Sequence, residues 1–317
     1  MVDSKQQWKA WLYLLPAIIL LLIFTVWPII NTVRMAFING FDFSYIAENT
    51  KDEKVISIGI RNFANVIRNP EFTTALQNTM LLCVVTVPLS TILALLIAVC
   101  LNSIKPLQKL LQTIFFLPYV TNSIAIGMVF AAMFNIVGNV VGGKIDGPLI
   151  NNPGIVNQII EFFGGTRINW MNSGSDPWNN IWVMIFYIVW NALPFKILIL
   201  LGGLQSVNKQ YYDAAKVDST PKWRVFTKIT VPLLSPMLAY VIITGFIGGF
   251  KEYSSIVGVF GEVMGPANHE LDTIVGFIYT SLATSEGRAS AAALFLFAII
   301  FAVTMVNLYV SKKNTHY

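Results

Sequence analysis

The chain alternates between long apolar stretches and shorter polar connections. A helix that crosses a membrane needs about 20 mainly apolar residues. The segments that meet this requirement are 10–33, 77–101, 110–134, 178–204, 233–257 and 288–310. The pattern therefore predicts an all-helical membrane protein with six spans. Because no internal repeat or linker is visible, residues 1–317 are predicted to form a single transmembrane domain.

Prolines interrupt nearly every predicted span. They stand at Pro16, Pro28, Pro88, Pro118, Pro194 and Pro236. Spanning helices tolerate proline where neighbouring groups satisfy the freed backbone carbonyls, so we expect a bundle of kinked helices.

The connections between the spans carry patterns of their own. An amphipathic helix at the membrane interface is predicted within 34–76, because one helical face would carry Ile60, Phe63, Val66 and Ile67. Residues 135–177 are rich in Gly, Asn and Pro and predict an irregular cap. The apolar stretch 272–283 is too short to span, which predicts a re-entrant or interfacial helix.

Composition and charge support a membrane location and an orientation. Hydrophobic residues make up 55% of the chain and charged residues 12%, about half the charged fraction of a soluble domain. The basic residues form no patch interleaved with aromatics, so they do not indicate a nucleic-acid partner. With the N-terminus inside, the inner connections hold mostly basic residues: Lys5, Lys9, Lys105, Lys109, Lys209, Lys216, Lys222, Arg224, Lys228, Lys312 and Lys313 against Asp3, Asp213 and Asp218. This bias predicts that both termini are cytoplasmic.

The connection 205–232 is longer and more structured than a simple link between two spans needs to be. We expect Asp213, Ala214 and Ala215 to open a short helix, because an acid is favourable near a helix N-terminus. Pro221 suits the first turn of a second helix that Thr220 would cap. Trp223 and Phe226 recur at helical spacing between basic residues, and Pro232 ends the stretch. These features predict a helical elbow on the cytoplasmic membrane face that a partner protein grips.

At these residues the sequence resembles the permeases of ABC importers, whose EAA loop reads E-A-A, three residues, G, nine residues and I-x-L-P. The same register holds Asp213-Ala214-Ala215, Ser219 and Ile229-Thr230-Val231-Pro232, with Asp for Glu, Ser for Gly and Val for Leu. Gly permits a backbone turn with positive φ at this position, whereas Ser219 would be strained in the same turn unless its φ is negative. The resemblance implies the type I ABC importer fold. It also implies ATPase-coupling roles for Asp213, Ala214, Ala215, Asp218, Ser219, Trp223, Phe226 and Pro232.

Three further segments resemble the first of the two permeases in maltose-type importers. They are GIRNFANVIRNPEFTTALQNT (59–79), GPANHELDTIVGFIY (265–279) and GRASAAALFL (287–296). This resemblance implies a carbohydrate substrate and a bacterial cell membrane. The implied partners are a second permease, two ATPase subunits that hold ATP and magnesium, and an extracytoplasmic sugar-binding protein.

Polar residues at membrane depth are candidates for the substrate pathway. The family's substrate contacts come from the fourth and fifth spans, and matching this chain to it indicates Trp190, Asn191, Gly249, Lys251, Glu252 and Tyr253. Two alternatives stay open for the charged residues: Lys251 and Glu252 as a pair that reaches water at the outer leaflet, and Lys196 extending to the inner interface. The span-five glycines serve equally well for close helix packing.

The sequence shows no catalytic or metal-binding pattern. Its two histidines, His269 and His316, have no nucleophile or metal partner nearby, and Cys83 and Cys100 lack metal-ligand spacing. No phosphate-binding loop is present, so we expect no enzyme activity, no cofactor and no metal in this chain. The alternative functions are a secondary carrier driven by an ion gradient, an ABC importer of a non-sugar solute and, least favoured, a membrane enzyme.

Overall fold

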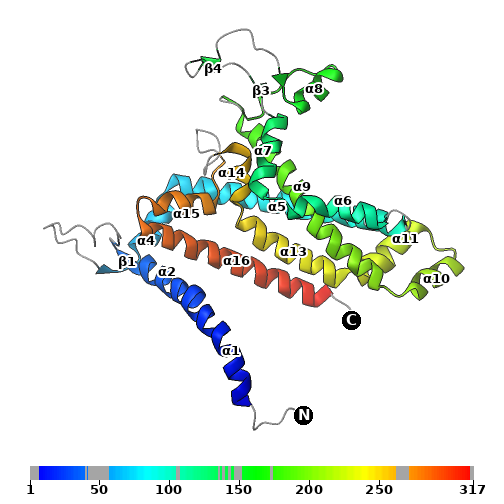
Figure 1. Ribbon diagram of the computed structural model, residues 1–317, viewed down its shortest axis with the longest axis horizontal. Coiled ribbons are helices and arrows are strands. Elements are labelled where there is room, and N and C mark those ends of the chain that lie inside the picture. The colour runs from blue at the N-terminus through cyan, green and yellow to red at the C-terminus, as the bar shows by residue number, and fades with distance from the viewer. Residues whose placement is uncertain are drawn as a thin grey trace. The chain divides into compact units, whose positions relative to one another are not determined.

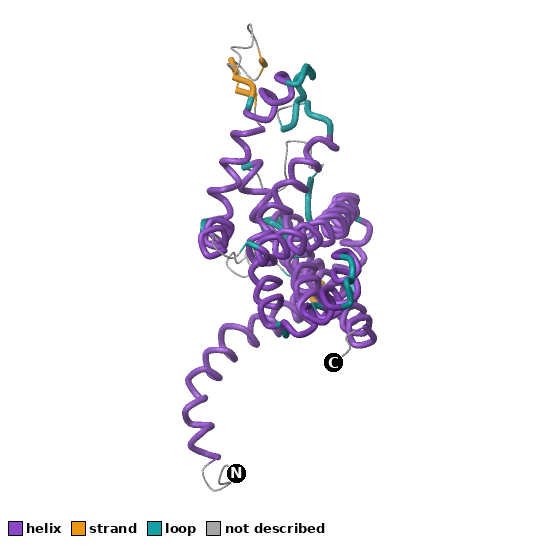
Figure 2. Tube along the Cα trace, turned by 90° about the vertical axis from the view of Figure 1, so that its right-hand side faces the viewer, coloured by secondary structure: helices purple, strands orange, loops and turns teal. Residues whose placement is uncertain are grey.

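The computed structural model describes residues 7–39, 41, 57–104, 108–134, 136–137, 140–141, 144–145, 152–171, 174–261 and 271–314 (Figures 1 and 2), and most of them are helical. Contacts within the chain define two compact units, Met1–Phe72 with Ile278–Leu296, and Thr73–Phe277 with Phe297–Tyr317. The single domain over 1–317 stays a prediction.

Four helical stretches are each long and apolar enough to cross a membrane. They are Trp11–Phe37, Pro70–Ser103, Pro177–Ser206 and Glu286–Ser311. Two bent pairs, Leu110–Val120 with Ser123–Phe134 and Lys222–Leu233 with Ser235–Phe250, pass the same test when taken together. Each of the six predicted segments therefore contains a helical stretch, but in the fifth, Ser235–Phe250 passes the test only together with Lys222–Leu233, which the sequence predicts as part of the cytoplasmic elbow.

The first stretch contains α1 (Gln7–Leu21), the π-helical turn η2 (Leu22–Val26) and α2 (Trp27–Phe37). The other elements of these stretches are α5 (Pro70–Ser103), α6 (Gln108–Val120), α7 (Ser123–Phe134), α9 (Pro177–Ser206), α13 (Ser235–Phe250) and α16 (Glu286–Asn314). The short helix α14 (Ser254–Phe260) follows α13.

The third and fifth spans are broken more sharply than the kinks that the sequence predicts. The third bends by 98° between α6 and α7, just after Pro118, whose ring removes a backbone donor from the last turn of α6. The fifth, predicted over 233–257, ends as a helix at Phe250, and α14 follows only after Lys251–Tyr253. Gly248 and Gly249 immediately precede that break, and their low helix propensity favours an end there.

In the first unit, α4 (Arg61–Arg68) packs under the end of α2. The Asn62 amide nitrogen donates to the carbonyl oxygens of Ala36 (3.1 Å) and Ile38 (2.9 Å), which satisfies the C-terminus of α2. Strands β1 (Ile38–Asn39) and β2 (Ser57–Ile58) pair antiparallel beside it. Short helix α15 (Ile274–Leu282), which spans the boundary between the two units, confirms the prediction of a brief helix in 272–283.

The apolar positions of α4 divide between the interior of the chain and its surface, and their location at the membrane interface stays a prediction. Val66 is buried, and the Phe63 ring packs against Phe37 and Phe295 with centroid distances of 5.0 and 5.7 Å. Ile60 and Ile67, in contrast, are exposed. The inward face is set by Asn62, which turns to cap α2, so the face that packs is rotated from the one that the apolar positions alone indicate.

The second unit is held together by α7, α9 and α14 at one end and by α5, α9 and α13 along its length. Helices α7 and α14 touch backbone to backbone (Figure 1): a Cβ atom on Gly127 would lie 2.5 Å from the carbonyl carbon of Gly258. Small residues at such crossings allow close helix packing in membranes. The Tyr187 hydroxyl on α9 donates to the carbonyl of Ser123 at 2.7 Å, which fixes the start of α7.

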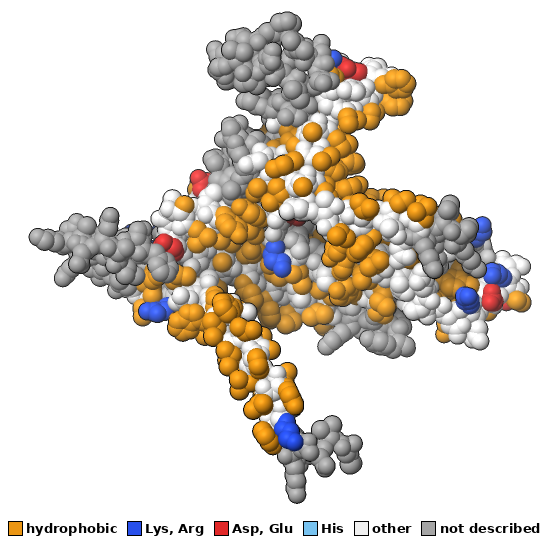
Figure 3. Space-filling model, in the orientation of Figure 1, with side chains coloured by type: hydrophobic (Ala, Val, Ile, Leu, Met, Phe, Trp, Pro, Cys, Tyr) orange, Lys and Arg blue, Asp and Glu red, His pale blue; other side chains and the backbone are white. Residues whose placement is uncertain are grey.

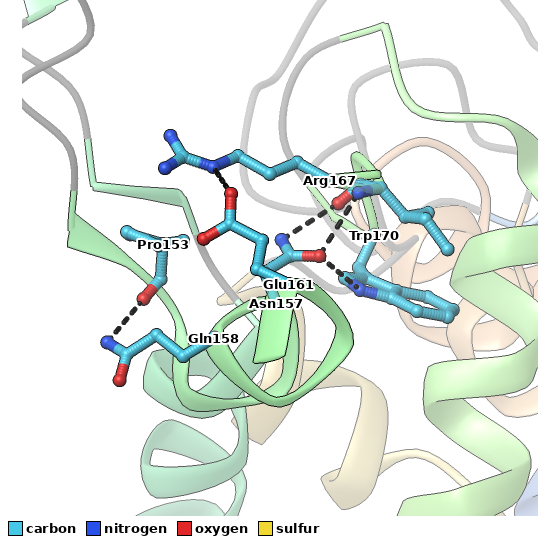
Figure 4. Close-up of polar contacts among 7 residues, drawn as sticks. Pro153, Asn157, Gln158, Glu161, Arg167 and Trp170 are labelled. Atoms are coloured by element: carbon cyan, nitrogen blue, oxygen red, sulfur yellow. Dashed lines mark hydrogen bonds and ion pairs between the residues drawn. The ribbon is translucent and has the colours of Figure 1, made fainter. Parts of the chain in front are cut away.

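The described residues of the segment 135–177 are more regular than predicted. It contains α8 (Ile155–Phe162) and two antiparallel strand pairs, β3 (Ile136–Val137) with β6 (Asn152–Pro153) and β4 (Val140–Val141) with β5 (Lys144–Ile145). Asn157 on α8 donates to the carbonyl of Ile168 and accepts from its amide and from the Trp170 indole (Figure 4). Glu161 and Arg167 form an ion pair beside it. The polar Asn157 faces inward and anchors the loop, a role that composition alone does not reveal.

Apolar side chains cover the outside of the spanning helices. Figure 3 shows them along the N-terminal helices α1 and α2, and the most apolar window of Trp11–Phe37 is entirely unburied within the chain. An exposed apolar surface of this extent is typical of helices that lipid or another membrane subunit covers.

Candidate functional site

A cavity of about 290 Å³ lies among α5, α6, α9, α13 and the turn that follows α13. Its polar lining comes from Thr86, Ser90, Asn191, Lys196, Thr244 and Glu252. Two aromatic residues also line it, Tyr119 on α6 and Phe195 on α9, whose rings stack with centroids 5.7 Å apart. The cavity thus combines an aromatic wall with several hydrogen-bonding groups inside a spanning bundle.

Lys196 is buried in the wall of this cavity, with 4% of its surface exposed. Its ammonium nitrogen donates to the Ser90 hydroxyl (2.7 Å), the Thr91 hydroxyl (2.9 Å) and the Val87 carbonyl (3.1 Å). All three acceptors belong to α5, so Lys196 links α9 to α5, and these bonds occupy all three N–H donors of its ammonium group. The alternative in which Lys196 extends to the inner interface is therefore wrong, because the hydroxyl face of α5 supplies nearer partners.

Glu252 follows the end of α13 and lines the cavity. Its side-chain oxygen accepts from the backbone amide of Ser255 at 3.2 Å, and its backbone carbonyl accepts from the Thr273 hydroxyl at 3.0 Å. Lys251 is exposed and outside the cavity lining, and the structure records no ion pair between these two described residues. The alternative of a Lys251–Glu252 pair therefore has no support in the geometry.

The predicted pathway residues divide into two groups. Asn191, Gly249 and Glu252 line the cavity. Trp190 instead packs on Phe130 with ring centroids 5.0 Å apart, since neighbours on a helix point in directions about 100° apart. Like Lys251, Tyr253 is outside the cavity lining.

Sequence reasoning missed several cavity residues, namely Thr86, Ser90, Tyr119, Phe195 and Thr244. Thr86 and Ser90 are four residues apart on an otherwise apolar helix, and this spacing is a signal for a polar face toward a partner helix. Tyr119 gave no signal of its own within an apolar span.

The span-five glycines serve both of the roles left open by the sequence. Gly249 lines the cavity, and a Cβ atom there would lie 2.6 Å from the sulfur of Cys83, so it also permits close packing of α13 on α5. Gly248 lines the cavity with no atom within 4 Å of an added Cβ. Gly248 therefore provides open space, while Gly249 is required by packing.

The predicted elbow is present as α10 (Lys209–Val217), α11 (Lys222–Val225), the π-helical turn η3 (Phe226–Thr230) and α12 (Val231–Leu233). Two details of the prediction are wrong. Asn208 caps α10 by accepting from the Gln210 amide, so Asp213, Ala214 and Ala215 lie in the middle of the helix rather than at its start. Thr220 makes no capping bond to α11, and Pro221 stands just before that helix.

Ser219 occupies a left-handed backbone conformation with a φ of 51°. The amide of Thr220 donates to the carbonyl of Ala215 (2.9 Å) and the Ser219 amide donates to that of Lys216 (3.0 Å). These two bonds form the Schellman motif that ends many helices with Gly in the left-handed position. The concern raised by the Gly-to-Ser difference is thus confirmed: the turn keeps the Gly geometry, and Ser219 bears the strain.

The remaining elbow residues present an exposed surface. Trp223 is 73% exposed and lies beside the Phe226 ring, with centroids 5.6 Å apart. Asp213 is exposed and forms an ion pair with Lys216 at 3.0 Å, while Ala215 is buried. Asp218 and Pro232 are exposed. Charged side chains gather where α10 and α11 lie (Figure 3).

Within the described residues, no group of three or more His, Cys, Asp or Glu side chains is arranged to hold a metal ion. Both histidines, His269 and His316, fall outside the described residues, as do Lys5, Lys105 and residues 265–270 of the segment 265–279. Cys83 is buried and Cys100 exposed, and both are free thiols.

Comparison with known proteins places this geometry among transport proteins. Residues 87–316 match the family described as "Binding-protein-dependent transport system inner membrane component". The arabinooligosaccharides transport system permease AraP of Halalkalibacterium halodurans is 28% identical over 311 residues, covering 97% of this chain and 89% of that protein. The lactose transport system permease LacF of Rhizobium radiobacter is 28% identical over 301 residues, covering 94% of this chain and 91% of that protein.

A solved structure supports the fold. In the crystal structure of a bacterial alginate ABC transporter in complex with an alginate pentasaccharide-bound periplasmic protein, one chain matches with a TM-score of 0.77 at 23% identity. The match covers 99% of this chain and 97% of that one. The described helices, including both bent pairs, thus adopt an established membrane-transporter fold.

Proposed function

The chain belongs to the family of binding-protein-dependent transport system inner membrane components, and from this premise we propose that it is a permease subunit of an ATP-driven importer of sugars or oligosaccharides. The names of its relatives favour this class, since AraP and LacF are permeases of arabinooligosaccharide and lactose transport systems. The observation that carries the proposal is the membrane-embedded cavity with the stacked pair Tyr119 and Phe195 facing polar groups.

A saccharide fits the chemistry of this cavity. Sugar rings present apolar C–H faces that pack on aromatic rings and hydroxyl groups that both donate and accept hydrogen bonds. Tyr119 and Phe195 offer the aromatic surface, while Asn191, Thr244 and Glu252 offer hydrogen-bonding groups. In this proposal Lys196 positions α9 rather than touching the substrate, because its three donors are already used.

The size of the cavity favours a shared pathway. Ligand pockets typically measure about 300–1,000 Å³, and the 290 Å³ formed by this chain lies at the lower limit of that range. A second permease that faces α5, α9 and α13 would supply the other wall and the room for a longer oligosaccharide. The chain therefore forms half of the translocation pathway.

Energy coupling is assigned to the elbow. Asp213, Trp223 and their neighbours on α10 and α11 would sit in a groove of an ATPase subunit, where an amphipathic helix acts as a rigid lever. Two ATPase subunits would hold ATP and magnesium, since this chain has no phosphate-binding loop. Movement of the elbow would pass through Pro232 and α12 into α13, which lines the cavity.

The remaining parts of the assembly follow from the orientation. Both termini and the elbow would face the cytoplasm of a bacterial cell, and an extracytoplasmic sugar-binding protein would dock on the outer connections, including α8. A carrier driven by an ion gradient does not require an exposed elbow of this kind. An importer of a non-sugar solute would keep the fold and the partners and differ only in the cavity lining.

Purification of the chain from its native membrane in mild detergent tests the proposal. We expect a second permease and an ATPase to co-purify, and the associated binding protein to bind a saccharide. Recovery of the chain alone, or with a binding protein that takes an amino acid or an inorganic ion, would contradict the assembly or the substrate class respectively.

A further inference from the structure

A second pocket lies beneath the elbow and plays no part in the pathway. Its volume is about 320 Å³, and its walls come from α5, α10, α11 and η3. Val99, Ala215 and Phe226 contribute apolar surface, whereas Lys216 and Lys222 contribute ammonium groups. The pocket therefore joins an apolar floor to a cationic rim.

The position of the pocket along α5 sets its depth in the membrane. Val99 stands in the last turns of this spanning helix, which ends at Ser103, so the pocket floor lies close to where the span leaves the hydrocarbon region. Lys216 and Lys222 belong to the elbow, outside the spans. The apolar floor and the cationic rim thus occupy the levels of lipid acyl chains and lipid headgroups.

The charges on the elbow favour an anion at the rim. Residues 209–230 contain five basic side chains and two acidic ones. Lys216 pairs with Asp213, but the pair is 77% and 66% exposed, and exposed pairs of this kind hold their partners weakly. For Lys222, no ion pair or side-chain hydrogen bond is recorded among the described residues.

The inner wall of the pocket has an uncommon backbone. Residues Phe226–Thr230 form a π-helical turn, a geometry that is rare and frequently found at functional sites. Its Thr230 hydroxyl lies 3.3 Å from the Tyr212 hydroxyl of α10, and both residues line the pocket. The Thr230 hydroxyl also donates to the Val225 carbonyl at 3.4 Å, so the two hydroxyls bond within the protein and hold α10 against this turn.

We propose that this pocket binds an anionic phospholipid, with the headgroup phosphate at Lys216 and Lys222 and the start of an acyl chain against Val99 and Phe226. A soluble phosphate would leave the apolar floor uncovered, and a neutral lipid would offer no negative charge to the two lysines. A bound lipid bridges α10 and α11 across the strained turn at Ser219, so it stabilises the elbow in one geometry. The inference needs only membrane insertion and is independent of the sugar substrate.

Native mass spectrometry of the purified assembly in micelles that contain equal amounts of phosphatidylglycerol and phosphatidylcholine tests this proposal. We expect the wild type to retain phosphatidylglycerol preferentially. The double variant Lys216→Gln/Lys222→Gln is expected to lose about tenfold or more of this preference, from the usual contribution of a lysine near an anionic lipid. The matched control Lys209→Gln/Lys228→Gln removes two exposed lysines of the same loop from outside the pocket and should retain it.

Two further measurements separate the pocket from general charge and from a soluble anion. Val99→Phe fills the floor without changing charge and should also reduce retention. An excess of glycerol phosphate, which has the headgroup chemistry without acyl chains, should leave the lipid bound. Equal loss in the control variant, undiminished retention in both pocket variants, or displacement by glycerol phosphate would each overturn the proposal. None of these outcomes bears on sugar transport.

Discussion

The ammonium nitrogen of Lys196 on α9 lies 2.7 Å from the hydroxyl oxygen of Ser90 on α5, inside the wall of the membrane cavity. The Ser90 hydroxyl in turn donates to the carbonyl of Thr86, and the Thr91 hydroxyl to that of Val87. Each hydroxyl therefore accepts from Lys196 while donating to its own helix. This arrangement holds a buried charge with all of its donors satisfied.

Removing the acceptors of Lys196 should cost more than removing Lys196 itself. In Ser90→Ala/Thr91→Val the buried ammonium loses two partners, and we expect a loss of about 3 kcal/mol in the free energy of unfolding. Lys196→Met removes charge and hydrogen bonds together and should cost about 1 kcal/mol. The triple variant should be more stable than the acceptor variant. Reversible unfolding by SDS in mixed micelles measures these differences, and an acceptor variant as stable as the wild type would refute the interaction.

Ser219 strains the turn between α10 and α11, so glycine at this position should stabilise the elbow. A side chain in the left-handed region costs about 1 kcal/mol, which Ser219→Gly removes. We expect slower hydrogen–deuterium exchange of the amides around Ser219 and Thr220 in this variant. Ser219→Val should accelerate exchange there, because a β-branched side chain tolerates positive φ poorly. Equal exchange in all three proteins would show that the turn is unstrained.

Trp223 should be a central anchor for the ATPase subunit. The side chain is 73% exposed, so Trp223→Ala leaves the fold of the chain intact while removing a large aromatic surface. We expect ATPase affinity to fall by about 2 kcal/mol or more, close to thirtyfold, when co-purification is measured against ATPase concentration. Asp213→Ala should act in the same direction. The control Trp182→Ala changes an exposed tryptophan of α9 outside the elbow and should retain the ATPase.

Asn191 and Trp190 are neighbours in sequence, but their substitution should affect different properties, transport and stability respectively. Asn191 lines the cavity, so Asn191→Ala should raise the KM for transport about fivefold to tenfold through loss of a hydrogen bond to substrate, with assembly unchanged. Trp190 packs on Phe130, so Trp190→Ala should lower the free energy of unfolding by about 2 kcal/mol. A raised KM in the Trp190 variant with normal stability would show that the assignment of the cavity wall is wrong.

The sequence predicted the parts of the molecule that depend on local pattern. Apolar length located the spans, and the spacing around Asp213 and Pro232 located the elbow, including the strain at Ser219. It did not predict the breaks after Val120 and Phe250, because a proline or glycine near a helix end allows a bend but does not require one.

The sequence did not predict which way the side chains in the spans point, because local pattern does not determine the tertiary neighbours of a residue. Asn191 and Trp190 differ by one helical step, and only the packing of Phe130 determines which of them faces the cavity. The sequence left open whether Lys196 extends to the inner interface, because its partners, Ser90 and Thr91, are about a hundred residues away in sequence. Contacts of this kind follow from the tertiary arrangement of α5 and α9 rather than from local pattern.

Uptake of labelled saccharide by proteoliposomes tests the central claim most directly. The vesicles would contain this chain with its co-purified partners, with the binding protein outside and ATP trapped inside. The account predicts accumulation that requires ATP and the binding protein and that is lost with Trp223→Ala but kept with Trp182→Ala. Accumulation that persists without ATP and follows an imposed proton or sodium gradient would contradict the account and establish a secondary carrier.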